Sequence, residues 1–120
     1  MKVEIPAEKH LTQTSVDDPA PYYYNWALRY PYLKRLKMVL SLLGGRSFTR
    51  LLEVGYGSGI FFPELGQRCQ RLVGVDLHRN GAAVHKMMEL EGIDGLLGTS
   101  DVLELWAGKS TPCAFQKFPP

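Results

Sequence analysis

A short apolar stretch followed at once by three closely spaced glycines constrains this fold more than any other feature of the sequence. Residues 51–54, with the sequence LLEV, are predicted to form a strand, and Gly55, Gly57 and Gly59 follow in a G-x-G-x-G pattern. The first glycine permits a sharp turn, and the second lets a ligand approach bare backbone. A helix expected next would present unpaired N–H groups at its start. This order of elements predicts a parallel α/β fold.

The segments on both sides of the glycine loop support that prediction, because strand and helix patterns alternate. The first helix is expected over about 58–69, and a second strand over 72–76 ends in an acid. A second helix over about 80–91 and a weaker strand over 95–98 follow. Three strands joined by two crossover helices imply a parallel sheet. The buried faces expected for the two helices are Phe61, Phe62 and Leu65, and Ala83, Met87 and Leu90.

The chain before the first strand divides into two segments. Residues 1–21 are polar and contain three prolines, which predicts an irregular or flexible lead-in. Residues 22–45 begin with six aromatic rings, and a helix with an apolar stripe then ends at Gly44-Gly45. The leucines of the stripe are Leu33, Leu36, Leu40 and Leu43.

The composition excludes several classes of protein. A net charge of +2, without a long Lys/Arg block, gives no indication of a nucleic-acid partner. No apolar run approaches the ~18 residues of a transmembrane helix, and the N-terminus has no apolar signal-peptide core. Cys69 and Cys113 are isolated, which fits a reducing cytoplasmic compartment, although a single disulfide remains open. No metal site is expected.

Three acids stand where such a fold places contacts to a ligand. Glu53 lies inside an apolar strand, a costly position for a charge that nothing uses. Asp76 ends the second strand, where a carboxylate can accept hydrogen bonds from both hydroxyls of a ribose. Asp101 follows the third strand at the same edge of the sheet. The dinucleotide pattern G-x-G-x-x-G is broken by Ile60, which argues against a pyrophosphate site.

Taken together, the stretches LLEVGYGSGIF, VGVDLH and GTSDVLEL resemble the class I S-adenosylmethionine-dependent methyltransferases across roughly residues 49–105. The resemblance implies a Rossmann-like sheet with flanking helices, and residues 46–105 as the cofactor-binding βαβαβ unit. It implies S-adenosylmethionine as the cofactor and transfer of its methyl group to an acceptor that the sequence does not identify. No residue is singled out as a catalytic base.

The resemblance also assigns roles to individual residues. Glu53 would help to place the amino-acid moiety of the cofactor, and Asp76 would bind the ribose diol. Asp101 would hydrogen-bond the adenine amino group. The other expected contacts are the glycine loop of Gly55, Gly57 and Gly59, Leu77 beside the adenine, and Val102 next to Asp101. Tyr56 occupies a variable position of the loop and is expected to be tolerated there.

Other interpretations of these features stay open. The loop could be a tight turn in another Rossmann-like protein, and a nicotinamide site is disfavoured by the broken pattern. His78 and His85 are expected to be surface or capping residues rather than metal ligands, since no third ligand is evident. The rings of residues 22–32 could form a lid over the cofactor, cover one face of the sheet, or contact a membrane surface.

The resemblance further implies a larger sheet than this sequence supplies. Class I enzymes have seven strands in the order 3-2-1-4-5-7-6, whereas three are predicted here. We therefore expect an incomplete fold with an irregular tail over 106–120, from a chain that is truncated or frame-shifted near residue 106 or is a fragment of a longer gene. The first strand would then be an exposed edge. The alternatives to an active enzyme are a non-catalytic remnant that binds S-adenosylmethionine and an inactive product that needs a partner chain to complete its sheet.

Overall fold

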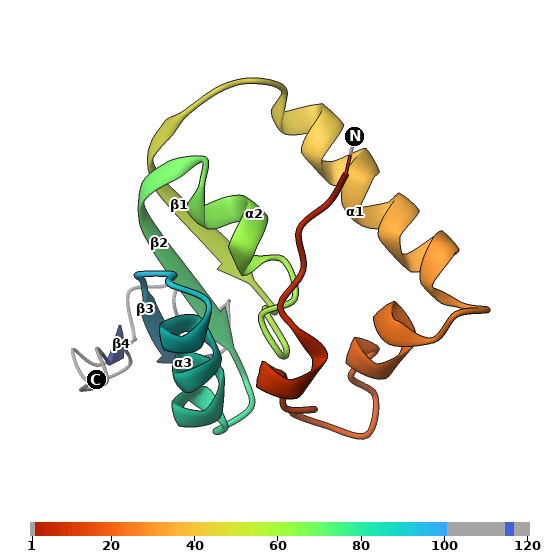
Figure 1. The fold of residues 1–120 in the computed structure, drawn as a ribbon. Helices are drawn as coiled ribbons and strands as arrows, with labels where there is room; N and C mark the ends of the chain where they lie inside the picture. Colours follow the sequence, from red (N-terminus) through yellow and green to blue (C-terminus); the bar gives the residue numbers. More distant parts are fainter. Residues whose placement is uncertain (1, 101–114, 117–120) are drawn as a thin grey trace.

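The sheet at the centre of the molecule is built from parallel strands. The computed structural model describes residues 2–100 and 115–116 (Figure 1). Strands β1 (Phe48–Val54), β2 (Cys69–Asp76) and β3 (Leu96–Thr99) lie side by side in chain order, and both pairings are parallel. The α/β class with a parallel sheet is therefore confirmed. The arrangement is that of an incomplete Rossmann-like fold.

A further strand extends the sheet on the side away from β1. Strand β4 (Phe115–Gln116) pairs antiparallel with β3, with Gly98 opposite Phe115. This short strand was not predicted, and it lies at the opposite edge from the one where the resemblance would place a fourth strand. In the described part of the chain, β1 is thus the edge strand, as expected, and Leu52 and Val54 are each 50% exposed on its outer face.

Helices cover the other face of the sheet (Figure 1). Helix α1 (Arg29–Leu43) precedes the sheet, and α2 (Phe62–Gly66) and α3 (Gly81–Leu90) connect its strands. The prediction of an N-terminal helix before the sheet is confirmed, and its leucine stripe contributes Leu36 and Leu40 to the core. None of the helices that the structure describes is both long and apolar enough to cross a membrane.

Helix α2 is much shorter than the predicted helix over 58–69. Gly59 has a φ of 81°, a left-handed conformation that cannot continue into an α-helix. The chain instead makes two successive turns, in which Gly59 N–H donates to the Tyr56 carbonyl and Phe62 N–H donates to the Gly59 carbonyl. The prediction of Phe61, Phe62 and Leu65 as the buried residues is nevertheless confirmed, because all three are at most 8% exposed.

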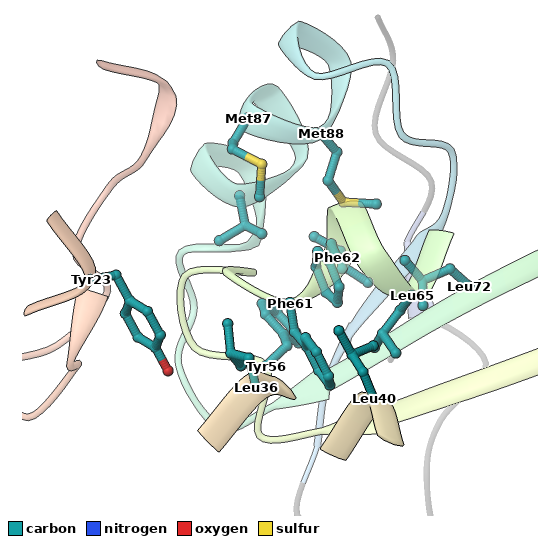
Figure 2. Packing of buried hydrophobic residues seen from close by; sticks show 12 residues of the cluster. Tyr23, Leu36, Leu40, Tyr56, Phe61, Phe62, Leu65, Leu72, Met87 and Met88 are labelled. Carbon is teal, nitrogen blue, oxygen red and sulfur yellow. The ribbon is translucent and has the colours of Figure 1, made fainter. Parts of the chain in front are cut away.

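The apolar core lies between the helices and the covered face of the sheet. Phe62 is completely buried at its centre, with Met87 and Met88 of α3 packed above it (Figure 2). Added Cβ atoms on Gly59 and Gly74 would stand 2.7 Å and 2.8 Å from the Phe62 ring. The ring therefore fills the space that the absence of side chains at these two glycines creates.

The buried face of α3 matches the predicted one at Met87 but not at Ala83 or Leu90. Val84, Met87 and Met88 are buried against the sheet, whereas Leu90 is 54% exposed and Ala83 is half-buried. Leu90 is the last residue of the helix and lies on its solvent side. The two adjacent methionines define the contact face, and a spacing of three to four residues alone did not distinguish it.

The lead-in is packed onto the α/β unit through specific contacts. It contains one short 3₁₀ helix (Glu8–His10), and a second (Ala20–Tyr24) begins at its end. Ala7 N–H donates to the carboxylate of Glu91, directly after α3. The Asn80 side chain donates to the Thr14 carbonyl at 3.0 Å. Figure 1 shows this segment running between α1 and the other two helices. The three prolines thus predicted the lack of long helices but not these attachments.

Replacing Phe62 with alanine should destabilise the protein strongly. Truncation of a fully buried aromatic ring leaves a cavity and costs about 3–5 kcal/mol of the free energy of unfolding. Leu42→Ala on α1 is the control, because Leu42 is 77% exposed and its truncation should change stability by only ~0.5 kcal/mol. Urea unfolding followed by circular dichroism measures both. Equal effects of the two substitutions would contradict this description of the core.

Candidate functional site

The glycine loop connects the carboxyl end of β1 to α2 and adopts a conformation that few other residues could share. Gly55, Gly57 and Gly59 have φ angles of 74°, 56° and 81°. These left-handed conformations are favourable only for glycine, so the loop folds back over the end of the sheet. Gly55 N–H donates to the Val75 carbonyl of β2 at 2.7 Å, which fixes the start of the loop against the neighbouring strand.

Asp76 holds the middle of this loop in place. Its Oδ2 accepts a hydrogen bond from Gly57 N–H at 2.7 Å, and its Oδ1 accepts one from Leu77 N–H at 2.6 Å. The Asp76 side chain is still 20% exposed, and each carboxylate oxygen can accept a further bond. Leu77 beside it is 68% exposed. Asp76, the residue predicted to bind the ribose, therefore also positions the loop, and its carboxylate stays partly accessible to a ligand.

His78 binds the carbonyl of the same residue, Gly57, which belongs to the next peptide group. Its Nε2 donates to the Gly57 carbonyl at 2.7 Å, and its Nδ1 accepts from Asn80 N–H at 3.1 Å. The ring also packs edge-on against Tyr56, with centroids 5.0 Å apart. His78 is thus a positioning residue of the loop, in line with the capping interpretation. His85 lies within α3, 3.3 Å from the Glu89 carboxylate.

Glu53 is an unpartnered acid beneath the loop. Its Oε2 is buried and has no hydrogen-bond partner within the described chain. Burial, reinforced by the negative charge of Asp76, raises the pKa of the Glu53 carboxyl to about 8. A buried polar atom without a partner costs about 1–3 kcal/mol, so this position is unfavourable for the fold on its own.

Tyr56 is buried, although its variable position in the loop gave no indication of burial. It is 3% exposed, and its ring lies 5.4 Å from that of Phe62. Its hydroxyl, like Glu53 Oε2, is buried without a partner in the described chain. Burial raises the pKa of this hydroxyl to about 12, so it remains a neutral donor at physiological pH.

Glu53 and Tyr56 line a cavity between β1, the glycine loop, α1 and the lead-in. Its volume is about 240 Å³. Glu53, Gly55 and Gly57 form one wall, and Arg35 and Asp18 belong to the other. Sequence reasoning found the first wall and missed the second. The remaining lining residues are Pro19, Tyr23, Leu36, Val39, Tyr56, Ser58, Ile60 and Phe61.

Asp18 fixes the lead-in at the edge of this cavity. Its Oδ2 accepts from Thr14 N–H and from the Thr14 hydroxyl at 2.9 and 3.0 Å, and its Oδ1 accepts from Ala20 N–H at 3.0 Å. Asp18 is 8% exposed, and a Cβ on Gly57 would stand 3.8 Å from Oδ1. The sequence Asp-Pro-Ala, an acid before a proline turn, is the signal that could have indicated these hydrogen bonds to Asp18.

The aromatic segment contributes one ring to the core and leaves others at the surface. Tyr23 is 4% exposed and points toward Leu36 and Tyr56 (Figure 2). Trp26 and Tyr30, in contrast, are 90% and 71% exposed. A cover of the cavity therefore involves Tyr23 in particular, rather than the aromatic segment as a whole.

The structure places the predicted contacts at different depths. Glu53, Gly55, Tyr56 and Gly57 line the cavity, whereas Asp76 and Leu77 do not line it and lie beyond Gly57. Gly59 is the part of the loop that packs against Phe62. Asp101 and Val102 lie outside the described residues.

No family model, curated protein or solved structure matches the chain. The geometry of the site must therefore support any functional argument. A larger hollow of about 790 Å³ lies near Cys69 and Asp94, at the opposite end of the strands from the glycine loop. Ligands of open α/β sheets bind outside the carboxyl ends of the strands, which favours the smaller cavity beside the loop as the candidate site.

The raised pKa of Glu53 should make stability depend on pH. The folded state holds the proton more tightly than the unfolded chain, so this contribution is complete below about pH 4.5 and is lost as pH rises through about 8. Glu53→Gln keeps the shape and removes the titration. The free energy of unfolding of the variant, measured relative to that of wild type, should therefore rise by on the order of a few kcal/mol between pH 5 and pH 8.5. Urea unfolding of both proteins at the two pH values measures the difference, and a constant difference would contradict the burial of this carboxyl.

Proposed function

We propose that the chain binds S-adenosylmethionine at this cavity and acts in methyl transfer to an unidentified acceptor in the cytoplasm. The observation that carries the proposal is the buried, unpartnered Oε2 of Glu53 beside the glycine loop. An acid that destabilises the fold is explained when a cationic group of a ligand pairs with it. The amino-acid end of S-adenosylmethionine carries such a group, an ammonium.

Asp76 and Leu77, beyond Gly57, fit the nucleoside part of the same ligand. Asp76 offers a free acceptor position on each oxygen to the ribose hydroxyls, and exposed Leu77 offers apolar surface beside them. Gly55 and Gly57 present backbone without side chains between these two ends. When bound, S-adenosylmethionine supplies an electrophilic methyl group on its sulfonium. The chain contributes orientation of that group, which by itself can lower the barrier to transfer.

A non-catalytic protein that binds S-adenosylmethionine is the alternative. In this alternative the described residues bind the cofactor, and none of them has an assigned role in binding a methyl acceptor. The two possibilities differ in one measurable outcome, the formation of S-adenosylhomocysteine from S-adenosylmethionine in the presence of candidate acceptors. Turnover that Asp76→Ala abolishes would support the enzyme, whereas binding without turnover would support the alternative.

Isothermal titration calorimetry tests the cofactor directly. Asp76→Asn should weaken binding of S-adenosylmethionine roughly 10- to 100-fold, because a hydrogen bond to a charged group contributes about 1.5–3 kcal/mol. Asp94→Ala is the control, since Asp94 is exposed and lies at the opposite end of the strands. Circular dichroism establishes that both variants are folded. Absence of binding by the folded wild-type protein would overturn the proposal.

We further propose that a strand from a partner chain pairs with the free edge of β1. Leu52 and Val54, each 50% exposed on this edge strand, offer apolar surface to such a partner. Unpaired strand edges readily add another strand. Sedimentation velocity of the purified chain should show self-association that Leu52→Lys reduces, with Leu42→Lys on α1 as the control for an exposed leucine. A monomer at all concentrations would contradict pairing between copies, and co-purification of another chain would identify a different partner.

A further inference from the structure

Helix α1 is apolar on its solvent side as well as on its buried side. Leu36 and Leu40 pack into the core, at 7% and 1% exposure. Met38 and Leu42 each follow one of these leucines by two residues, which places them about 200° around the helix axis, and they are 61% and 77% exposed. Helix α1 lies at the periphery of the molecule (Figure 1), where the face opposite the core is normally polar.

Basic residues surround this exposed apolar pair. Tyr30, Lys34, Met38 and Leu42 repeat every four residues and form one stripe along the outer side of α1, with Arg35 next to Lys34. All five are exposed, and we call them the outer face of α1. Neither cation of the outer face forms a salt bridge with an acid of the described chain.

An exposed aromatic ring stands at each of two positions near the start of the helix. Trp26, in the turn that precedes α1, is 90% exposed, and Tyr30, in the first turn of the helix, is 71% exposed. Trp and Tyr rings have an apolar body and a polar tip, and they are enriched where proteins meet the interface of a lipid bilayer. Isolated exposed apolar residues are ordinary, but a group of large ones along one segment indicates a binding surface.

The charge of this part of the chain is uniformly positive. Every charged residue between Pro19 and Leu52 is basic, and all 12 acidic residues of the chain lie outside this span. The small net charge of +2 therefore conceals a strong asymmetry between this segment and the rest of the chain. The basic residues of the span are Arg29, Lys34, Arg35, Lys37, Arg46 and Arg50. Such a segment complements a partner that carries negative charge.

We propose that α1 docks on the surface of a bilayer that contains anionic lipids, with the helix lying along the interface. Met38 and Leu42 enter the boundary between headgroups and acyl chains, and Trp26 lies at headgroup level. The cations bind the anionic headgroups. Contact with phosphates or carboxylates alone would leave both aliphatic side chains in water, which favours a bilayer over a nucleic acid or an acidic protein. This inference does not depend on the proposed function.

The docking surface adjoins the candidate cavity. Arg35 belongs to the outer face of α1 and also lines the cavity, together with Val39 one helical turn later. Docking through α1 therefore places the cavity beside the lipid headgroups.

Co-sedimentation with lipid vesicles tests the proposal. Wild-type protein should bind vesicles of phosphatidylcholine with phosphatidylserine, and should bind vesicles of phosphatidylcholine alone much more weakly. The variant with Lys34→Gln and Lys37→Gln should bind the anionic vesicles roughly fivefold more weakly for each charge removed. Leu42→Asp should weaken binding at least about tenfold, because an apolar contact is lost and a negative charge is added.

Helix α3 provides the matched controls. Leu90→Asp introduces the same change at a leucine that is 54% exposed, and the variant with Arg79→Gln and Lys86→Gln removes two exposed cations at and just before this helix. Both controls should bind anionic vesicles as wild type does. Circular dichroism establishes that all variants are folded. Equal weakening in the controls and in the α1 variants would overturn the proposal, since it would show attraction without a defined surface.

The fluorescence of Trp26 distinguishes insertion from attraction between charges. The chain has 2 tryptophans, so Trp106→Phe leaves Trp26 as the only one. Its emission should shift to shorter wavelength when anionic vesicles are added, because the ring leaves water. Absence of vesicle binding by the folded wild-type protein would overturn the proposal. Binding of poly-glutamate as tight as that of the vesicles, with no shift of Trp26 emission on vesicles, would also overturn it and would indicate an acidic protein partner.

Discussion

The backbone of Gly57, hydrogen-bonded through both its N–H and its carbonyl, is the constraint on which the candidate site depends. Asp76 accepts a bond from the Gly57 N–H and His78 donates one to the Gly57 carbonyl, so two residues at and just after the end of β2 fix the loop that follows β1. A loop of left-handed glycines loses much conformational entropy on becoming ordered, and these two bonds offset part of that loss. They also fix the loop that follows Glu53 relative to Asp76.

The strands, the loop and the acid at the end of β2 were predictable because they depend on local sequence. The apolar run 51–54 and the glycine spacing specify their own backbone, and Asp76 follows from strand register. The short helix α2 was not predictable from periodicity, since the left-handed Gly59 and the close approach of Phe62 to two glycines arise from tertiary packing. Local pattern and packing therefore account for different parts of this fold.

The cavity residues that come from α1 and the lead-in also depend on packing more than on local sequence. Arg35 and Asp18 lie in segments whose sequence indicates a surface helix and an irregular lead-in, and their place in the same cavity as Glu53 depends on how α1 and the lead-in pack. Sequence did indicate that Glu53 was unusual, because an acid inside an apolar strand needs an explanation. The identity of the cofactor and the roles of Asp101 and Val102 stay predictions.

The long-range bonds of the lead-in determine the order in which the site can assemble. Glu4 N–H donates to the Glu64 carboxylate, 60 residues later, and Ala7 N–H donates to Glu91, 84 residues later. Residues 4 and 7 therefore acquire these partners only after Glu64 of α2 and Glu91, directly after α3, have been synthesised. Contacts of such sequence separation form late because loop closure must precede them. The lead-in, which also supplies Asp18 and Pro19 to the cavity, thus docks after the segments on which it packs.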